Sequence, residues 1–465
     1  MTSTIRVSVV APVYNAEPFL LDFVNSFLKQ TLHPLSTELV AVDDGSTDRS
    51  GSILDDVALE HENVTVIHQE NSGWPGRPRN VGVEAARGDY VFFADPDDEF
   101  GGPEALQRLA DFADQHSSDV VVPKMVAKGK RSYGQSRYAV TQIDADLTTC
   151  FTTLTPQKLF RRSFLIEEGI RFPEGETRLE DGQLLSQAYF LAKRVSLLTG
   201  YDFYYLFTRP DQDHLSARPK DPRAYVHAVE IMSENVEKYC SDQDLGDKII
   251  NDIYSRKVLH NFSGSRLLRH SEKRRANWLE NQQRFIERFI NGRRFEKLGA
   301  AAKARTELVI AGDPKAIVGY ACVGAADFEF DSARSVRGRV ELRGKLTGPV
   351  RAEDPPELVI VDREVKGHTS NVQLLGEGGQ SVAKIAKTVF PRSSSVKRYD
   401  LWFSAGQGHQ MRRIESPDNA LRRTFTDDRT IVIYTTKMGN LSVEVKPGLT
   451  IGQRIKRRIR RLVSS

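Results

Sequence analysis

Three carboxylates directly after an apolar segment have the spacing of a divalent metal site. The loop Asp95-Pro96-Asp97-Asp98 follows the apolar residues 90–94. Pro96 stiffens the loop, and the alternate carboxylates of Asp95 and Asp97 can converge on a hard cation such as Mg²⁺ or Mn²⁺, which would neutralise a diphosphate. An acidic turn exposed to solvent is the alternative, because D-x-D is short and frequent.

Two further loops combine turn residues with ligand-binding groups. Asp43 and Asp44 precede Gly45, and paired carboxylates at a strand end can accept hydrogen bonds from a ligand, although a well-capped turn has the same composition. Residues 71–80 contain two glycines, two prolines and two arginines. Glycines let the backbone approach a ligand, and Arg79 offers a planar donor fork to a base carbonyl or a phosphate; a flexible surface loop is the alternative.

A fourth acidic pair, Glu180-Asp181, stands at the start of an expected helix. Acids favour a helix N-terminus through the helix dipole, so capping alone would explain the pair. A carboxylate here could also take a proton from an acceptor hydroxyl that a substrate brings within about 3 Å. The two roles are compatible.

The elements that must position these residues alternate between strand and helix. Residues 5–12, 38–42, 64–68 and 90–94 are apolar strands, and residues 16–30, 52–60 and 81–86 are helical in pattern, followed by a helix at 181–193 and a strand at 195–198. Nearly continuous apolar strands that alternate with helices predict a parallel sheet covered on both faces, with ligands beyond the carboxyl ends of the strands. The fold class is therefore α/β.

The pattern changes twice after this domain. Residues 1–220 form the expected catalytic domain, and residues 221–307 show apolar positions among many charges, as in a helical extension. Residues 308–450 show short alternating strands with turn signals, which predict an antiparallel β-sandwich domain. The basic residues scattered over this last region either follow an anionic polymer or simply solvate the sheet edges.

The charge balance separates a tail from the rest of the chain. The 465 residues carry a net charge of +4, with 39% hydrophobic and 28% charged residues, which excludes a disordered polymer, a fibre and a multispanning membrane protein. Residues 453–465 hold six basic residues and no acid. As a helix, residues 451–465 would present one apolar stripe flanked by these cations, which suits an anionic membrane surface; a disordered basic tail is the alternative.

Cysteine content and the N-terminus indicate a reducing compartment. The three cysteines are few, odd in number and widely spaced, so no disulfide framework or zinc site is expected. Neither a signal peptide nor an apolar run of about 18 residues is apparent. We therefore expect a cytoplasmic protein, either free or peripheral at the inner face of the plasma membrane.

Taken together, the motifs identify a protein family far more specifically than any one of them does alone. In chain order, VSVVAPVYNAEPFL, LVAVDDGSTDRS, IHQENSGWPGRPRNVGVEAARGDYVFFADPDDEF and KLFRRSFL with IRFPEG and LEDGQLL resemble the family 2 glycosyltransferases, which have the A-type glycosyltransferase (GT-A) fold. The similarity covers about residues 5–210. The Gly/Pro loop, the helical segment and the β-rich region look most like the polyribitol-phosphate glycosyltransferases that decorate wall teichoic acid.

The resemblance implies a role for each motif residue. Asp181 matches the general base of inverting members, with Glu180 beside it. Asp95 matches the aspartate that faces ribose or sugar, and Asp97 the one that binds the metal. Arg209 and His214 fall where relatives close a basic lid, although their spacing departs from the usual pattern, and Lys158 and Arg161 would shape the acceptor side. The residues that match the uridine pocket are Pro12, Tyr14, Asp44, Asn71 and Arg79.

The resemblance implies an inverting, Mn²⁺- or Mg²⁺-dependent transfer of a sugar from a UDP-sugar donor. N-acetylglucosamine is the expected sugar, and the expected acceptor is a hydroxyl of an anionic cell-wall polymer such as poly(ribitol phosphate). The resemblance also implies homo-oligomers. Nucleic-acid binding is not expected, because the body of the chain is slightly acidic. A non-catalytic scaffold for an anionic glycopolymer, or transfer to another polysaccharide or glycolipid, are the alternatives.

Overall fold

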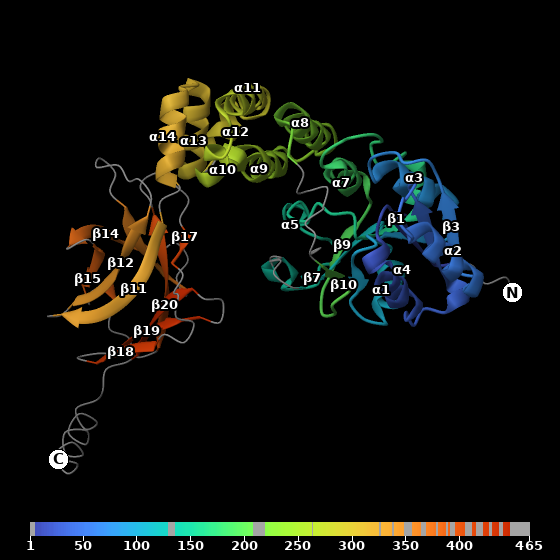
Figure 1. Cartoon of the computed structure of the whole chain (residues 1–465), viewed down its shortest axis with the longest axis horizontal. Coiled ribbons are helices and arrows are strands. Elements are labelled where there is room, and N and C mark those ends of the chain that lie inside the picture. The colour runs from blue at the N-terminus through green and yellow to red at the C-terminus, as the bar shows by residue number, and fades with distance from the viewer. Residues whose placement is uncertain are drawn as a thin grey trace, which may run out of the picture. The chain divides into compact units, whose positions relative to one another are not determined.

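In the computed structural model, the protein consists of two compact units (Figure 1). The units comprise residues 1–258 with 284–297, and residues 259–283 with 298–465. Arg209, His214 and the basic tail lie outside the described residues. The described residues are 5–128, 135–207, 219–262, 264–324, 327–336, 339–347, 356–363, 369–377, 380–386, 389–390, 396–404, 412–414, 422–426, 430–436 and 440–446.

The first unit is built on a seven-stranded sheet with the order β3-β2-β1-β4-β8-β6-β9. The strands β3, β2, β1 and β4 are parallel, as the alternating pattern predicts. β8 runs antiparallel to both β4 and β6, so the sheet is mixed. The direction of a three-residue strand depends on the path of the chain, and periodicity does not encode it. The strands are β1 (Val7–Val13), β2 (Thr37–Asp43), β3 (Val64–His68), β4 (Tyr90–Phe93), β6 (Val120–Pro123), β8 (Leu159–Arg161) and β9 (Val195–Leu198).

Helices cover the central sheet because its strands are apolar on both faces. Val9 of β1 belongs to a core cluster with Phe23 of α1 and Leu109 of α4, whereas Val10 faces Gly82 of α3. A second sheet of three short strands, β5 (Glu99–Phe100), β10 (Tyr204–Leu206) and β7 (Met125–Ala127), adjoins this domain. The helices are α1 (Glu17–Leu28), α2 (Ser50–Glu60), α3 (Gly76–Ala85), α4 (Ala105–His116), α5 (Leu147–Cys150), α6 (Arg162–Glu167) and α7 (Glu180–Leu191), with 3₁₀ turns η1 (Pro34–Ser36) and η2 (Gln135–Tyr138).

Helix α3 begins earlier than the sequence pattern indicates. The prediction starts at residue 81, whereas the helix begins at Gly76 and includes Pro78 in its first turn. A proline is tolerated there because the first N–H groups of a helix have no intrahelical acceptor. Arg79 therefore stands on a helix, where its backbone is fixed.

The helical segment continues beyond residue 307, where the sequence pattern changes. It ends at Gly324, and its last helix starts with Pro314 in the first turn, a favoured position for proline. No helix in the described ranges is long and apolar enough to cross a bilayer. The elements are α8 (Pro222–Tyr239), α9 (Gln243–Ile253), the π-helical turn η4 (Tyr254–Val258), η5 (Leu259–Phe262), α10 (Gly264–Leu268), α11 (Glu272–Phe289), α12 (Gly292–Glu296), α13 (Ala300–Ala311) and α14 (Pro314–Gly324).

A buried carboxylate joins α9 to the α12 region. Asp247 is 1% exposed and pairs with Arg293 Nε at 2.8 Å, Arg294 Nε at 2.9 Å and Lys297 Nζ at 2.9 Å. Asp247→Ala leaves these cations without their shared anion, so we expect the free energy of unfolding to fall by about 2–3 kcal/mol. Urea unfolding measures this. The control Asp244→Ala removes a carboxylate that is 83% exposed, and an equal loss in both variants would contradict the prediction.

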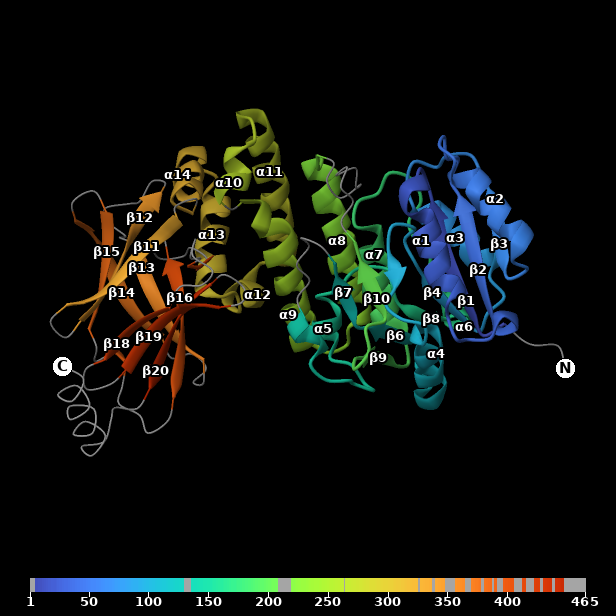
Figure 2. The ribbon, with the colours of Figure 1, turned by 60° about the horizontal axis from the view of Figure 1, so that its bottom comes forward.

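The C-terminal strands form one antiparallel sheet with the order β11-β12-β15-β14-β13-β16-β20-β19-β18, with β17 paired to β16 (Figure 2). Its end strands β11 and β18 also contact each other, and a single apolar cluster fills the interior. The antiparallel all-β prediction is confirmed. The strands are β11 (Asp327–Val336), β12 (Arg339–Thr347), β13 (Glu357–Asp362), β14 (Thr369–Glu377), β15 (Gln380–Ala386), β16 (Lys397–Ser404), β17 (Arg412–Arg413), β18 (Arg422–Thr426), β19 (Thr430–Thr435) and β20 (Leu441–Lys446).

Candidate active site

The predicted motifs converge at one edge of the central sheet. Tyr14 follows β1, Asp44 follows β2, Asn71 lies just beyond β3 and Asp95 follows β4. Because these four strands are parallel neighbours, their carboxyl ends lie side by side. Pro12, the penultimate residue of β1, is buried at the same edge. These residues, which are far apart in the sequence, therefore form one continuous rim of candidate ligand-binding residues.

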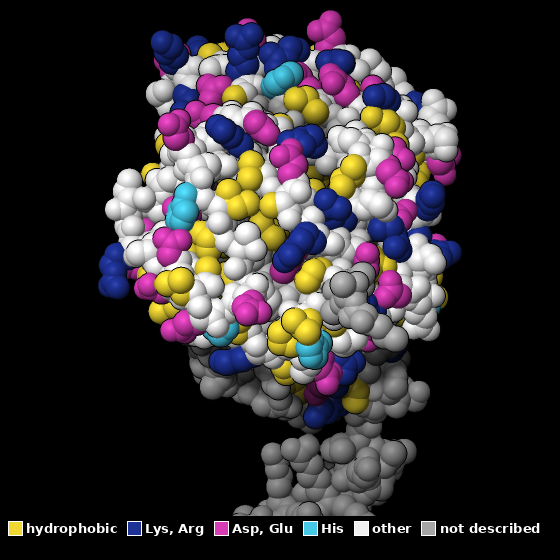
Figure 3. Space-filling view, turned by 90° about the vertical axis from the view of Figure 1, so that its right-hand side faces the viewer, with side chains coloured by type: hydrophobic (Ala, Val, Ile, Leu, Met, Phe, Trp, Pro, Cys, Tyr) yellow, Lys and Arg dark blue, Asp and Glu magenta, His cyan; other side chains and the backbone are white. Residues whose placement is uncertain are grey.

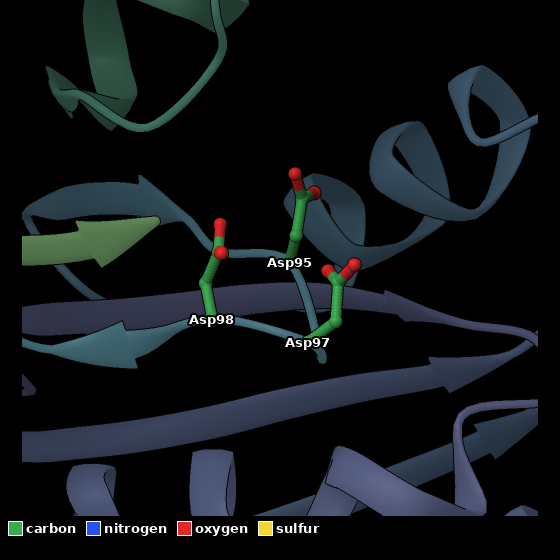
Figure 4. Close-up of side chains that lie close together, drawn as sticks. All are labelled: Asp95, Asp97 and Asp98. Atoms are coloured by element: carbon green, nitrogen blue, oxygen red, sulfur yellow. The ribbon is translucent and has the colours of Figure 1, made fainter. Parts of the chain in front are cut away.

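The acidic loop carries three carboxylates whose ligand atoms lie within 4.8 Å of one another. Figure 4 shows Asp95, Asp97 and Asp98 projecting from the same side of the loop. Asp98 Oδ1 accepts the Phe207 N–H at 2.8 Å, and the Asp95 N–H donates to Tyr204 Oη at 2.9 Å. Clustered carboxylate oxygens on a fixed loop suit a hard divalent cation, so the donor set fits the predicted Mn²⁺ or Mg²⁺.

Arg79 connects the acidic loop to the predicted base. Its side chain is 4% exposed, and its guanidinium donates to Asp181 Oδ1 at 2.7 Å and to Asp95 Oδ1 at 2.9 Å, with Glu180 Oε1 at 3.7 Å. Burial works against the charge, but the three carboxylates hold the pKa of Arg79 above its ordinary value. Its two donor arms are thus occupied by carboxylates, and a uridine contact for Arg79 stays a prediction.

Asp181 lies in the first turn of α7 and is connected to the rim through Arg79. Burial raises the pKa of Asp181 to about 8, the Arg79 guanidinium opposes this shift, and the Glu180 and Asp95 carboxylates add to it. The preceding residue, Leu179, has a left-handed backbone with φ 57°, which an L-residue adopts only at a cost. Since 23% of the Asp181 side chain remains accessible, a substrate can reach this carboxylate.

The loops after β1, β2 and β3 are tied together around Asp44. Asp44 accepts the Ser72 N–H at 3.0 Å and the Ser72 hydroxyl at 2.8 Å, and Asn15 Oδ1 accepts the Thr47 N–H at 2.8 Å. At Gly45, where φ is +70°, a Cβ would lie 2.7 Å from the Asn71 nitrogen. Glycine at position 45 thus allows the two predicted nucleotide-binding loops to pack against each other.

Three further side chains lie around the carboxylates: the family resemblance places Lys158 on the acceptor side, whereas Gln157 and Lys257 had no sequence signal. Gln157 donates to Asp95 Oδ2 at 2.6 Å. Burial lowers the pKa of Lys158 to about 7, and burial also lowers that of Lys257; in each case the charge of Asp181 opposes the shift, so both lysines lie near this acid. Only tertiary structure reveals these neighbours, because they come from an antiparallel strand and from the helical segment.

The proposed acceptor-side role does not fit Arg161. This residue pairs with Tyr90 in the β4–β8 register, at the opposite end of β4 from the acidic loop. Its guanidinium donates to Asp119 at 3.1 Å and to the Ser118 carbonyl at 3.1 Å. The antiparallel direction of β8 explains the difference, because it carries Arg161 away from the site and leaves Lys158 close to it.

Charges of both signs alternate over the face of the molecule drawn in Figure 3. On this face Lys and Arg side chains are interspersed with Asp and Glu, which agrees with the nearly equal numbers of basic and acidic residues in the sequence. An evenly mixed surface gives little long-range steering of a polyanion. This face therefore shows no large patch of one charge sign.

The parallel strands and the acidic rim at their carboxyl ends agree with the predicted GT-A fold, and comparison with known proteins gives the family. Residues 8–173 match the family model described as glycosyl transferase family 2, and residues 222–321 match the glycosyl transferase TarS linker domain. Residues 8–173 are therefore a family 2 glycosyltransferase domain. Within that family it is similar to poly(ribitol-phosphate) glycosyltransferases.

Two curated relatives carry this narrower similarity. The poly(ribitol-phosphate) beta-glucosyltransferase of Bacillus spizizenii is 38% identical over 228 residues, which are 48% of this chain and 36% of the relative. The poly(ribitol-phosphate) beta-N-acetylglucosaminyltransferase TarS of Staphylococcus aureus is 33% identical over 265 residues, which are 56% of this chain and 46% of the relative. The chain thus spans less than half the length of either relative.

Solved structures show the same fold. S. aureus TarS 1–349 in complex with UDP-GlcNAc superimposes with a TM-score of 0.62 and 26% identity, covering 73% of this chain and 96% of that chain. Another crystal structure of S. aureus TarS covers 96% of this chain and 86% of that chain, with a TM-score of 0.64 and 21% identity. The predicted GT-A fold with its helical and β-rich additions is confirmed.

Proposed function

We propose that the protein is an inverting, metal-dependent transferase that moves a sugar from a UDP-sugar to a hydroxyl of poly(ribitol phosphate) or a similar anionic polymer. The observation that carries the proposal is the Arg79 bridge, which joins the acidic loop to an accessible carboxylate of raised pKa. The names of the relatives support the polymer as acceptor. N-acetylglucosamine is the proposed sugar, because UDP-GlcNAc is the ligand of a structural relative.

In this proposal each group has a separate task. A bound Mn²⁺ or Mg²⁺ would stabilise the negative charge of the departing diphosphate, with Asp97 and Asp95 to hold it. Asp181 removes the proton of the acceptor hydroxyl, while Arg79 fixes its orientation through the 2.7 Å bond. Attack from the face opposite the diphosphate inverts the anomeric carbon. No covalent intermediate on the protein is needed.

The proposal is tested by measuring UDP release from UDP-sugars with and without poly(ribitol phosphate). Release should require Mn²⁺ or Mg²⁺, stop with EDTA and resume when the metal is restored. Asp97→Asn should raise the metal concentration needed for half-maximal activity. If no donor in a panel of UDP-sugars is consumed in the presence of polymer and metal, the protein is not this transferase, and the scaffold function takes its place.

Activity should rise with pH through the pKa of Asp181. A general base must be deprotonated, and burial raises the pKa of Asp181 to about 8. We therefore expect kcat/KM to increase about tenfold per pH unit below pH 8 and to level off above it. A pH profile under initial-rate conditions measures this. A profile that is flat between pH 6 and 9 would remove Asp181 from the role of base.

A compact group of cations supports an anionic acceptor. Arg266, Arg269 and Lys273 are exposed on and beside α10 and at the start of α11. Burial and the nearby charges of Arg274 and Arg269 lower the pKa of His270, so these two arginines lie near this imidazole. Glu272 is the single acid between residues 264 and 275. Such a cluster attracts a phosphate polymer.

Removing this cluster should weaken polymer use and spare the donor. In Arg266→Ala/Arg269→Ala/Lys273→Ala, we expect the KM for poly(ribitol phosphate) to rise about tenfold, since three exposed charge contacts are worth about 0.5 kcal/mol each. Hydrolysis of the UDP-sugar without polymer should stay at the wild-type rate. The control Arg223→Ala/Lys248→Ala removes exposed cations elsewhere. Equal KM values in all three proteins would exclude the cluster as an acceptor site.

Membrane attachment through residues 451–465 and self-association remain part of the proposal. The tail lies outside the described residues, so its amphipathic pattern is the support. An enzyme that acts on a cell-wall polymer precursor at the cytoplasmic face would use such an anchor. Removal of residues 450–465 should abolish sedimentation with anionic liposomes, and sedimentation velocity reads the oligomeric state.

A further inference from the structure

Gln157 lies beside Asp95 although the two residues are 62 positions apart. Its amide Nε2 donates to Asp95 Oδ2 at 2.6 Å, and its side chain is 2% exposed. The β4–β8 register explains the meeting. Phe92 pairs with Leu159 in antiparallel register, so continuing the ladder by two positions places residue 157 opposite residue 94, next to Asp95.

An internal hydrogen bond holds the short segment that contains Gln157. Lys158 is fully buried, and its Nζ donates to the carbonyl oxygen of Thr155. This bond spans the residues on both sides of Pro156, whose ring already restricts the backbone. Gln157 therefore lies on a short rigid segment that leads directly into β8.

Stability alone does not explain a glutamine at this position. Its Oε1 atom is buried and has no hydrogen-bond partner in the part of the chain that the structure describes. A buried carbonyl oxygen without a donor is costly, and an apolar residue of similar volume would avoid this cost. The favourable contact that glutamine makes is the bond to Asp95.

We infer that Gln157 is a positioning residue that fixes the Asp95 carboxylate for the nucleotide sugar and its metal; this inference rests on the proposed function. Arg79 binds Oδ1 and Gln157 binds Oδ2, so each carboxylate oxygen has its own donor and the group is held against rotation. The remaining lone pairs then point in a set direction before any ligand arrives. Hydrogen-bonded partners of this kind orient metal-binding carboxylates.

The test compares Gln157→Met with wild-type protein in the full chain. Methionine keeps the volume and removes both the donor and the unpartnered oxygen, so the melting temperature should be unchanged or higher. Affinity for UDP with Mn²⁺, measured by calorimetry, should fall about tenfold or more. The KM for the UDP-sugar should rise, whereas the KM for the polymer should stay constant.

Gln30→Met is the matched control. The Gln30 amide bonds backbone groups of Ser26, Gly102 and Leu106, so its loss should lower the melting temperature without changing UDP–Mn²⁺ affinity. Wild-type affinity in Gln157→Met would overturn the inference. If wild-type protein binds UDP–Mn²⁺ but transfers no sugar, the proposed function fails while the comparison of affinities still decides the role of Gln157. Wild-type protein that binds no UDP overturns both.

Discussion

Asp181→Asn should abolish sugar transfer and leave donor binding nearly intact. The amide cannot accept a proton from the acceptor hydroxyl, and a positioned general base contributes roughly 10²–10⁴-fold to the rate. In the wild-type protein Asp181 Oδ1 accepts the Arg79 N–H at 2.7 Å. Asparagine keeps an oxygen at this position, so the bridge to the acidic loop can persist. We therefore expect kcat to fall at least 100-fold while the affinity for UDP changes less than threefold.

Two measurements isolate the chemical step in this variant. Calorimetry with UDP and metal reports donor binding, and UDP release with saturating polymer reports transfer. Glu176→Gln is a matched change, because Glu176 is an exposed carboxylate in the loop before α7. It should behave as wild type in both assays. Full activity of Asp181→Asn, or a parallel loss of UDP affinity, would show that Asp181 is not the base.

The parallel half of the sheet could be predicted because local pattern and position coincide there. The strand at residues 64–68 and the strand at 195–198 have the predicted bounds. Every residue of β1 and β2 is buried, which agrees with their largely apolar sequences. Helix α3 was placed too late, because Gly, Pro and Arg in its first turns look like a loop until the neighbouring chain is known.

The rim residues could be predicted because they follow parallel strands, and Asp181 because an acidic pair begins a helix. Asp44 and Asp95 lie at the same edge because β2 and β4 are parallel strands on either side of β1, and this edge follows from the alternating pattern. Gln157 reaches Asp95 through an antiparallel strand of three residues, whose direction has no sequence signature. Arg79 was recognised as a ligand-binding candidate, but its pairing with Asp181 requires the chain path between residues 79 and 181.

The Arg79 bridge leads to the second large effect, because three carboxylates share this one cation. Arg79→Met leaves Asp95, Asp181 and Glu180 around an apolar side chain. Like charges that lose their common cation bind protons more strongly, so the pKa of Asp181 should move further above its value of about 8. At neutral pH an even smaller fraction of the base would then be deprotonated than in the wild type. The loss of a buried partner also costs about 3 kcal/mol of folding free energy.

We expect kcat/KM of Arg79→Met at pH 7 to fall at least 100-fold, with partial recovery as the pH is raised, because alkali deprotonates Asp181. Arg79→Lys should be intermediate, since one ammonium cannot reproduce two separate donor arms at 2.7 and 2.9 Å. It also keeps a cation if the methionine variant does not fold. Arg171→Met, which removes a guanidinium that is 53% exposed, is the control. If Arg79→Lys has wild-type activity and an unshifted pH profile, Arg79 does not influence the protonation of Asp181. Its ion pairs would then have a purely structural role.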